Sequence, residues 1–341
     1  PVILAVADST SLNHGTHPHT QGLGPIGSGE GKCARGLMLH ETMAFTPDGT
    51  ALGLLDVQCW ARTQLGTRHQ CHEKPIEEKE SMKWVRGLEA LNAVQPRLRK
   101  TMLVMVADRE ADIYELFARQ ASTARAAQLL IRAERSRNRK TAEEDDDQNV
   151  ELLWPLVDRQ PVLAKRELLV PPTDKHAARQ TTLELRAMPA TLRAPKRVAN
   201  LPDVEVWAVM AREVTAPKGV EPLEWLLVTT VKTQSKTEVE RLLEWYTRRW
   251  GIEVFHRILK SGCRAEARQL ETASRLLNCL AIDLIIAWRI QYLASLGREA
   301  PDVPCTVYFS DSEWKALTTF TSGTKMPPPV PPSLNDAVAL L

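Results

Sequence analysis

The chain has 341 residues, of which 43% are hydrophobic and 25% are charged, which is enough for one large domain or two ordinary ones with real cores. The net charge of +2 excludes a uniformly basic protein, so any basic surface must be local. The cysteines form no CxxC pair and are irregularly spaced, which favours a reduced cytoplasmic protein over a disulfide-stabilised secreted one; they are Cys33, Cys59, Cys71, Cys263, Cys279 and Cys305.

The first 132 residues alternate between strand-like and helix-like patterns. Two short apolar runs, residues 2–7 and 102–107, predict buried strands, and each stops at an aspartate, Asp8 and Asp108. Between them lie a predicted hairpin (residues 37–45 and 51–60, around a Pro-Asp-Gly turn) and a helix at residues 77–91. A helix at residues 112–121 and a strand at 128–132 complete this part.

The pattern changes after residue 134. A charge run follows, with Arg135, Arg137, Arg139 and Lys140 before five acidic residues at 143–147, and it predicts a solvated loop. Strand-like segments at 162–170, 181–186, 204–212 and 225–231 then indicate a β-rich insertion. Helices are predicted at residues 237–261 and 272–295.

The most apolar stretch of the chain covers residues 276–290 and contains Asp283 and Arg289. It is too short to span a bilayer, so we expect a buried helix and no membrane partner. The chain begins without Met, directly before a strand pattern, and ends after a proline-rich stretch. We therefore expect a fragment of a longer protein.

The two aspartates that end buried strands are the first chemical signal. If the strands are neighbours in one sheet, the carboxylates lie within a few ångströms of each other, and paired carboxylates suit Mg²⁺. The alternative is that each aspartate caps a helix or a turn.

A second signal lies in the predicted helix at residues 237–261. Tyr246, Arg249, Glu253 and Lys260 are 3, 4 and 7 positions apart, which places them within roughly 60° of one helix face. One acid among Tyr, Arg and Lys suits a metal ligand beside phosphate-binding groups. The alternative is a solvated face with ion pairs between neighbouring turns.

Residues 108–113 (DREADI) and the Tyr-Arg-Glu-Lys spacing at 246–260 resemble the signatures of the bacterial DDE transposases of the insertion-sequence-four group. Further matching segments run in the same order from residue 1 to about 300. The resemblance implies an α/β, RNase H-like (retroviral-integrase-type) catalytic core. It also implies a β-rich insertion between the second aspartate and the glutamate helix.

The resemblance also implies the site. Asp8, Asp108 and Glu253 match the catalytic residues that bind two Mg²⁺ ions, for which Mn²⁺ can substitute. The matches for phosphate-binding residues near the transposon end are Tyr246, Arg249 and Lys260, and Arg132 matches an arginine near the cleaved end. Trp225 matches a tryptophan that stacks on a flipped base, although a tryptophan of the core at a strand start is the alternative.

On this basis we expect a cut-and-paste transposase that binds transposon ends and target DNA and forms a homodimer in its synaptic complex. The expected domains are a catalytic core at residues 1–134 and 235–297, an insertion at 135–234, and the start of a truncated C-terminal domain at 298–341. The N-terminal end-recognition domain of the relatives is expected to be missing.

Two other functions stay open from the sequence. One is a different RNase H-like nuclease, which would share the three acidic residues but would not join DNA ends. The other is an inactive or domesticated transposase that acts as a DNA-binding or inhibitory protein. A structural zinc site is disfavoured because the spacing fits no standard finger; its residues would be His14, His17, His19, His69, Cys71 and His72.

Overall fold

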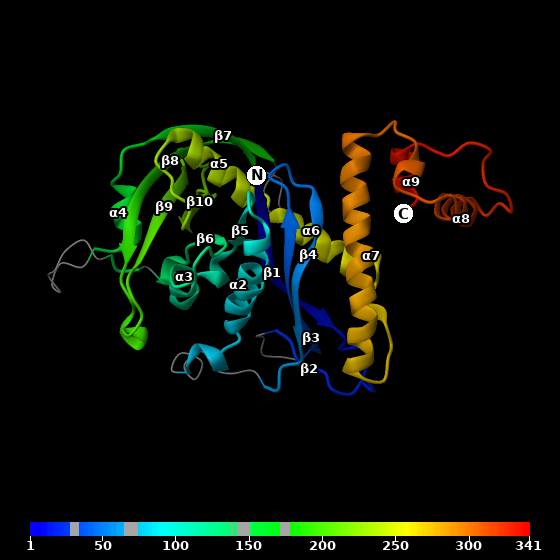
Figure 1. Cartoon of the computed structure of the whole chain (residues 1–341), viewed down its shortest axis with the longest axis horizontal. Helices are drawn as coiled ribbons and strands as arrows, with labels where there is room; N and C mark the ends of the chain where they lie inside the picture. The colour runs from blue at the N-terminus through cyan, green and yellow to red at the C-terminus, as the bar shows by residue number, and fades with distance from the viewer. Residues whose placement is uncertain (28–33, 65–73, 138, 142–150, 171–177) are drawn as a thin grey trace. The chain divides into compact units, whose positions relative to one another are not determined.

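The computed structural model describes residues 1–27, 34–64, 74–137, 139–141, 151–170 and 178–341 (Figure 1). The chain divides into two compact units. The first unit contains Pro1–Asp8 and Gly66–Arg249, and the second contains Ser9–Leu65 and Trp250–Leu341. The chain therefore passes to the second unit between Asp8 and Ser9, returns to the first between Leu65 and Gly66, and passes to the second again between Arg249 and Trp250.

The first unit is built on a mixed sheet. Its strands follow the order β1-β5-β6-β10-β9-β8-β7, with β1–β5 and β5–β6 parallel and the other pairs antiparallel. The strands are β1 (Val2–Asn13, of which the first seven residues lie in this unit), β5 (Met102–Ala107), β6 (Gln128–Arg132), β7 (Ala164–Val170), β8 (Arg179–Leu192), β9 (Val204–Glu213) and β10 (Glu224–Thr229).

Continuous apolar runs form the centre of this sheet. Every residue from Leu4 to Ala7 and from Val104 to Ala107 is fully buried, as expected for parallel strands that are covered on both faces. Helix α5 packs against β5, β7 and β8, while α3 packs against β6, β9 and α2. The helices of this unit are α2 (Met82–Val94), α3 (Tyr114–Ala121), α4 (Leu153–Asp158) and α5 (Lys236–Thr247).

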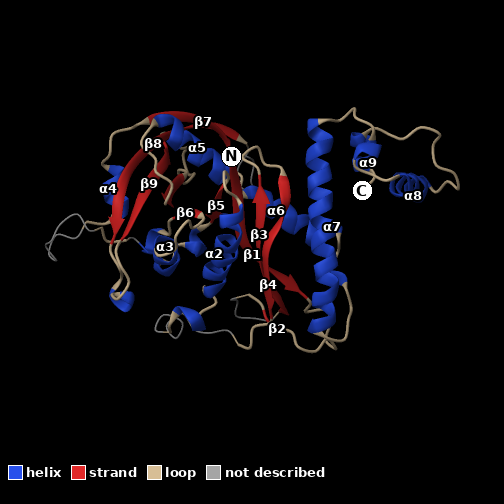
Figure 2. Ribbon diagram, in the orientation of Figure 1, coloured by secondary structure: helices blue, strands red, loops and turns tan. Residues whose placement is uncertain are grey.

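The second unit combines a small sheet with helices (Figure 2). Strand β3 (Arg35–Phe45) forms an antiparallel hairpin with β4 (Ala51–Trp60), pairs with β2 (Gly24–Pro25) and lies beside β1. Helix α7 (Ala273–Glu299) packs on β4, where Trp288 Nε1 donates a hydrogen bond to the carbonyl of Ala51 at 3.0 Å. Shorter helices are α6 (Trp250–Arg257), α8 (Asp311–Ser322) and α9 (Leu334–Ala339).

The C-terminal segment has a small core of its own within the second unit. Helices α8 and α9 pack at the end of α7, as Figure 1 shows. Buried residues join the three helices; they are Leu293, Cys305, Phe309, Trp314, Leu334 and Ala337. The boundaries predicted for the domains stay predictions.

Strand β1 differs from its expected length, because it continues through Asp8 to Asn13 instead of ending at Ala7. Its last residues belong to the second unit, where β3 supplies a neighbouring strand. The approach is so close that a Cβ atom on Gly36 would lie 1.8 Å from the carbonyl oxygen of Leu12. Only glycine fits at that position of β3.

The helix expected at residues 237–261 is not continuous. Helix α5 ends at Thr247, α6 begins at Trp250, and a π-helical turn covers Ile258–Gly262. Between the helices, the amides of Arg248 and Arg249 donate to carbonyls three residues back, which tightens the chain. The expectation that Tyr246, Arg249, Glu253 and Lys260 share one face of one helix is therefore wrong.

Helix α7 is longer and more exposed than expected. It has 27 residues, and by length and composition alone it could cross a membrane. The prediction of a buried helix too short to span is therefore wrong, since Ile282 and Ile285 are each 61% exposed. The helix predicted at residues 272–295 is confirmed within a few residues, so the apolar stretch lies inside a longer helix.

The remaining predicted elements are confirmed within a few residues. Helices α2 and α3 begin later than expected because short 3₁₀ turns, Ile76–Glu78 and Arg109–Ala111, precede them.

Candidate active site

In the first unit, an ion pair joins two of the predicted site residues. The parallel pairing of β1 with β5 ends at Val6 and Val106, and Asp8 lies two residues beyond this pairing. Arg249 Nη1 donates a hydrogen bond to Asp8 Oδ2 at 2.9 Å, and the side chains are only 18% and 13% exposed. The break after α5 therefore places a guanidinium against the first carboxylate of the predicted triad.

Asp108 directly follows β5, the parallel neighbour of β1. Its Oδ1 atom accepts a hydrogen bond from the backbone N–H of Glu110 at 2.8 Å, so it caps the 3₁₀ turn that follows. The alternative that Asp108 caps a turn is thus confirmed. A cap uses one lone pair of one oxygen, and the carboxylate keeps further sites for a cation.

Tyr246, near the end of α5, connects the predicted residues of this unit. Burial raises the pKa of its hydroxyl; the nearby positive charges of Arg132 and Arg249 lower it, and the negative charge of Asp108 raises it. Trp225 packs edge-on against the Tyr246 ring, with the ring centroids 5.7 Å apart. The first unit therefore gathers these residues around one buried tyrosine.

Asp112, the last aspartate of the DREADI segment, holds this region together. Its Oδ2 accepts from the backbone N–H of Glu134 at 2.8 Å, and its Oδ1 forms a buried ion pair with Arg139. Arg137 donates to its carbonyl oxygen at 2.9 Å. These contacts fasten the segment after β6, which carries Arg132, to the segment after β5.

The expectation that the charge run is solvated is wrong for Arg139, whose side chain is only 10% exposed. The physical reason is its partner, because a buried arginine is tolerated where a carboxylate compensates its charge. The acidic residues 143–147 of the same run lie outside the described residues.

Glu253 and Lys260 belong to the second unit, so the predicted triad is divided between the units. Glu253 is half-buried on α6, one turn before His256, and a ligand atom of each lies within 4.8 Å of the other. His256 Nε2 is 3.1 Å from Oε2 of the fully buried Glu41 on β3. The sequence analysis missed Glu41 and His256, although the i, i+3 spacing of Glu253 and His256 predicts a shared helix face.

The model of the family described as "Transposase DDE domain" matches residues 84–288, well over half of the chain. The chain belongs to the DDE transposase family. This membership gives the mixed α/β sheet an RNase H-like fold, and DDE transposases use divalent metal ions. The match contains Asp108, Trp225, Tyr246, Arg249 and Glu253, while Asp8 precedes it.

The chain also resembles a solved structure, the piggyBac transposase in a synaptic complex with hairpin DNA. The identity is 9%, the TM-score is 0.41, and the match covers 87% of this chain and 48% of that one. The chain thus spans about half the length of that protein.

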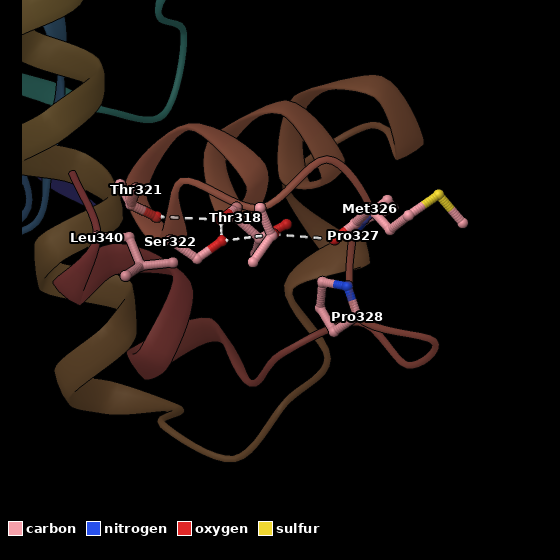
Figure 3. Close-up of a pocket in the computed structure, with 8 residues that line it drawn as sticks. Thr318, Thr321, Ser322, Met326, Pro327, Pro328 and Leu340 are labelled. Carbon is pink, nitrogen blue, oxygen red and sulfur yellow. Dashed lines mark hydrogen bonds between the residues drawn. The ribbon is translucent and has the colours of Figure 1, made fainter.

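The second unit contains a pocket that none of the predicted site residues lines. It opens between the end of α8, the proline-rich loop and Leu340 (Figure 3). Its lining residues include Thr318, Ser322 and Met326, and none of the predicted catalytic or DNA-binding residues is among them.

The residues of the disfavoured zinc site are only partly among the described residues. The rings of His14 and His17 are buried with centroids 5.5 Å apart, whereas His19 is exposed. In the described part of the chain, no third His, Cys, Asp or Glu joins them in a group that could hold a metal. Residues 69, 71 and 72 lie outside the described residues.

Proposed function

We propose that this chain cleaves and joins DNA strands in cut-and-paste transposition, with Asp8, Asp108 and Glu253 as the metal ligands. The observation that carries the proposal is the arrangement in the first unit. Carboxylates follow the paired ends of two adjacent parallel strands. Arg249 pairs with Asp8, and Tyr246 interacts with Asp108, Arg132 and Arg249. Such a combination suits a metal-dependent reaction on a phosphodiester.

Covalent geometry supports Glu253 as the third ligand. Glu253 is four positions after Arg249, so their Cα atoms are at most about 14 Å apart. The Arg249 side chain is itself hydrogen-bonded to Asp8. The covalent chain therefore limits how far Glu253 can lie from the residue that pairs with Asp8.

The donor set fits two divalent cations, because carboxylate oxygens are the ligands that Mg²⁺ prefers and Mn²⁺ accepts. When bound, the two ions would activate a water or 3′-hydroxyl and stabilise the leaving oxygen. The role of Asp8, Asp108 and Glu253 is to hold these ions and to compensate their charge.

The remaining residues bind and orient the DNA. We propose that Tyr246, Arg249 and Lys260 contact phosphates near the transposon end. Arg132 would lie near the cleaved end. A guanidinium has five N–H donors, so Arg249 can bind Asp8 and a phosphate at the same time. Trp225 would offer its ring to a flipped base during hairpin formation, which typically gains about 1–3 kcal/mol from stacking.

The proposal extends to the insertion-sequence-four group, to a hairpin intermediate and to a homodimer in the synaptic complex. The residues that support it are the DREADI segment and the Tyr-Arg-Glu-Lys spacing. The flanks of the gene provide the test substrate, because inverted repeats around it define the transposon ends.

The decisive experiment is a strand-transfer assay on a pre-cut end duplex with a labelled 3′-hydroxyl, a supercoiled target plasmid and Mg²⁺. A transposase produces joined end–target molecules, and the Glu253→Gln variant does not. Cleavage of uncut ends without any joined product would instead indicate another RNase H-like nuclease. Binding without either reaction would indicate an inactive DNA-binding protein.

A further inference from the structure

A buried carboxylate–imidazole pair lies beside Glu253 in the second unit. Glu41 is on β3, a strand in which every residue after Arg35 is buried, and its side chain is 0% exposed. Its Oε2 accepts from His256 Nε2 at 3.1 Å. Its Oε1 atom is buried and has no hydrogen-bond partner among the described residues.

Burying the Glu41 carboxylate costs solvation free energy unless a nearby positive charge compensates it. A carboxylate removed from water loses several kcal/mol of solvation, and a single hydrogen bond recovers only part of it. Burying Glu41 therefore favours positive charge on or directly behind the imidazole that it contacts.

The hydrogen bond also sets the state of the His256 ring. A neutral imidazole that donates from Nε2 carries its lone pair on Nδ1. Which nitrogen of a histidine binds a metal is commonly decided in this way, by a carboxylate that accepts from the other nitrogen. Glu41 is placed to select this tautomer and to make the ring a better electron-pair donor.

The side chains of His256 and Glu253 lie on the same face of α6. The two residues are three positions apart, and one ligand atom of each lies within 4.8 Å of the other. Two ligands of one small cation are separated by roughly this distance or less, since each metal–ligand bond is about 2.0–2.2 Å. A single ion could therefore contact both side chains after a small adjustment.

We infer that His256 is a metal ligand beside Glu253 and that Glu41 holds it in position. The inference rests on the proposed function, since it adds a nitrogen ligand to the metal site of the three carboxylates. An imidazole binds first-row transition-metal ions more strongly than it binds Mg²⁺. The site should therefore prefer Mn²⁺ to Mg²⁺ more strongly than three carboxylates alone would.

The test is electron spin-echo modulation spectroscopy of Mn²⁺ bound to the full chain, because a directly ligated imidazole gives strong modulation from its nitrogen nucleus. We expect this modulation in the wild-type protein and its loss in the His256→Gln variant. Mn²⁺ affinity should fall about 10–100-fold in that variant. Mg²⁺ affinity should fall less.

The Glu41→Gln variant distinguishes the positioning role of Glu41 from metal binding by His256. Its amide keeps nearly the same shape but lacks the negative charge, so the nitrogen modulation should persist while Mn²⁺ affinity falls about ten-fold. His19→Ala removes an exposed imidazole of the same unit and should change neither readout. Circular dichroism melts of each variant identify any that fail to fold, and the wild-type spectrum tests ligation without any substitution.

The outcomes distinguish this inference from the function on which it rests. If Mn²⁺ binding depends on Glu253 but shows no nitrogen modulation, His256 is not a ligand and the carboxylate site stands. If no Mn²⁺ binding depends on Glu253, both proposals are wrong. If Glu41→Gln binds Mn²⁺ as tightly as the wild type, Glu41 does not position the ring.

Discussion

Arg249 and Asp8 are 241 positions apart in the chain, yet Arg249 Nη1 donates to Asp8 Oδ2 at 2.9 Å. Both side chains are largely buried. In the absence of a metal ion, this guanidinium supplies the positive charge that a carboxylate in such a place requires. A cation bound by Asp8 would take over part of that role.

The Arg249→Ala variant should therefore be less stable than the wild type without metal, and metal should stabilise it more strongly. Loss of a largely buried, charged hydrogen bond costs about 1.5–3 kcal/mol. Saturating Mn²⁺ should restore part of this loss, so that the metal-induced rise in melting temperature is larger in the variant than in the wild type. The measurement is a set of thermal melts with and without Mn²⁺.

The adjacent Arg248→Ala variant is the control for this prediction. Arg248 pairs with Glu244 at 3.4 Å on the surface, and exposed pairs contribute about 0–1 kcal/mol. It should melt almost like the wild type at every metal concentration. Equal metal responses in the Arg249 and Arg248 variants would show that Arg249 does not act as a substitute for the cation.

Lys260 in the π-helical turn should contact a phosphate of the transposon end. Replacing it by Ala should lower the slope of log Kd against log salt concentration by about one unit, since one fewer counterion is released. Lys236→Ala is the matched control, because Lys236 lies on the exposed first turn of α5 near Glu240. An unchanged slope for Lys260→Ala would place this lysine outside the DNA interface.

Trp225 is only partly buried and packs edge-on against Tyr246, so its ring can offer a face to a base. Trp225→Ala should leave the first nick nearly normal and slow hairpin formation by roughly one to two orders of magnitude, equivalent to about 1–3 kcal/mol of stacking. Trp225→Phe should recover much of the rate. Time courses that resolve nicked, hairpin and blunt products measure both steps.

Trp207 provides the control for Trp225. It pairs with Thr229 at the other end of the same antiparallel pair, β9 and β10, and is partly buried too. Trp207→Ala should lower the melting temperature without a selective loss of hairpin. If Trp225→Ala instead reduced all products equally with a depressed melt, its role would be that of a core residue.

Glu213 in β9 should make the first unit sensitive to acid. Hydrogen bonds from Arg179, opposed by burial, lower the pKa of this carboxyl from 4.5 to about 2. A lowered folded-state pKa gives stability that is complete above pH 4.5 and lost as the pH falls toward 2. The wild type should thus lose on the order of 3 kcal/mol more unfolding free energy than Glu213→Gln over this range.

Urea unfolding at pH values across this window measures the difference. Glu221→Gln, a change at an exposed glutamate in the loop before β10, should follow the wild type. Parallel stability curves for Glu213→Gln and the wild type would show that the buried ion pair with Arg179 does not contribute.

The parts of the fold that the sequence predicted well have a local cause. Strands β5 and β6 agree with expectation to the residue, because β5 is a continuous apolar run and β6 has an apolar centre between Gln128 and Arg132. The break between α5 and α6 has no comparable local signal, since the helical periodicity continues across it. At the start of α6, the close approach of Gly251 to the Phe45 ring, 2.8 Å from where a Cβ atom would lie, is a tertiary contact that periodicity does not predict.

Residues of the candidate site could be predicted from the sequence only where they belong to a recognisable motif. The residues gathered around Tyr246 belong to segments with a recognisable spacing. Glu41 and Arg139 escaped prediction because a single charged residue in a strand, or in a charge run, normally lies at the surface. Their burial depends on partners, His256 and Asp112, that are far away in sequence.

The central claim is that Asp8, Asp108 and Glu253 hold the metal ions that cleave DNA. The most direct test is the nicking rate of a transposon-end duplex in Mg²⁺ by Asp8→Asn, Asp108→Asn and Glu253→Gln variants, with DNA binding measured in parallel in Ca²⁺. Each variant should bind the duplex nearly as tightly as the wild type and show no detectable nicking. Near-normal nicking by any one of the three would contradict the assignment of that residue.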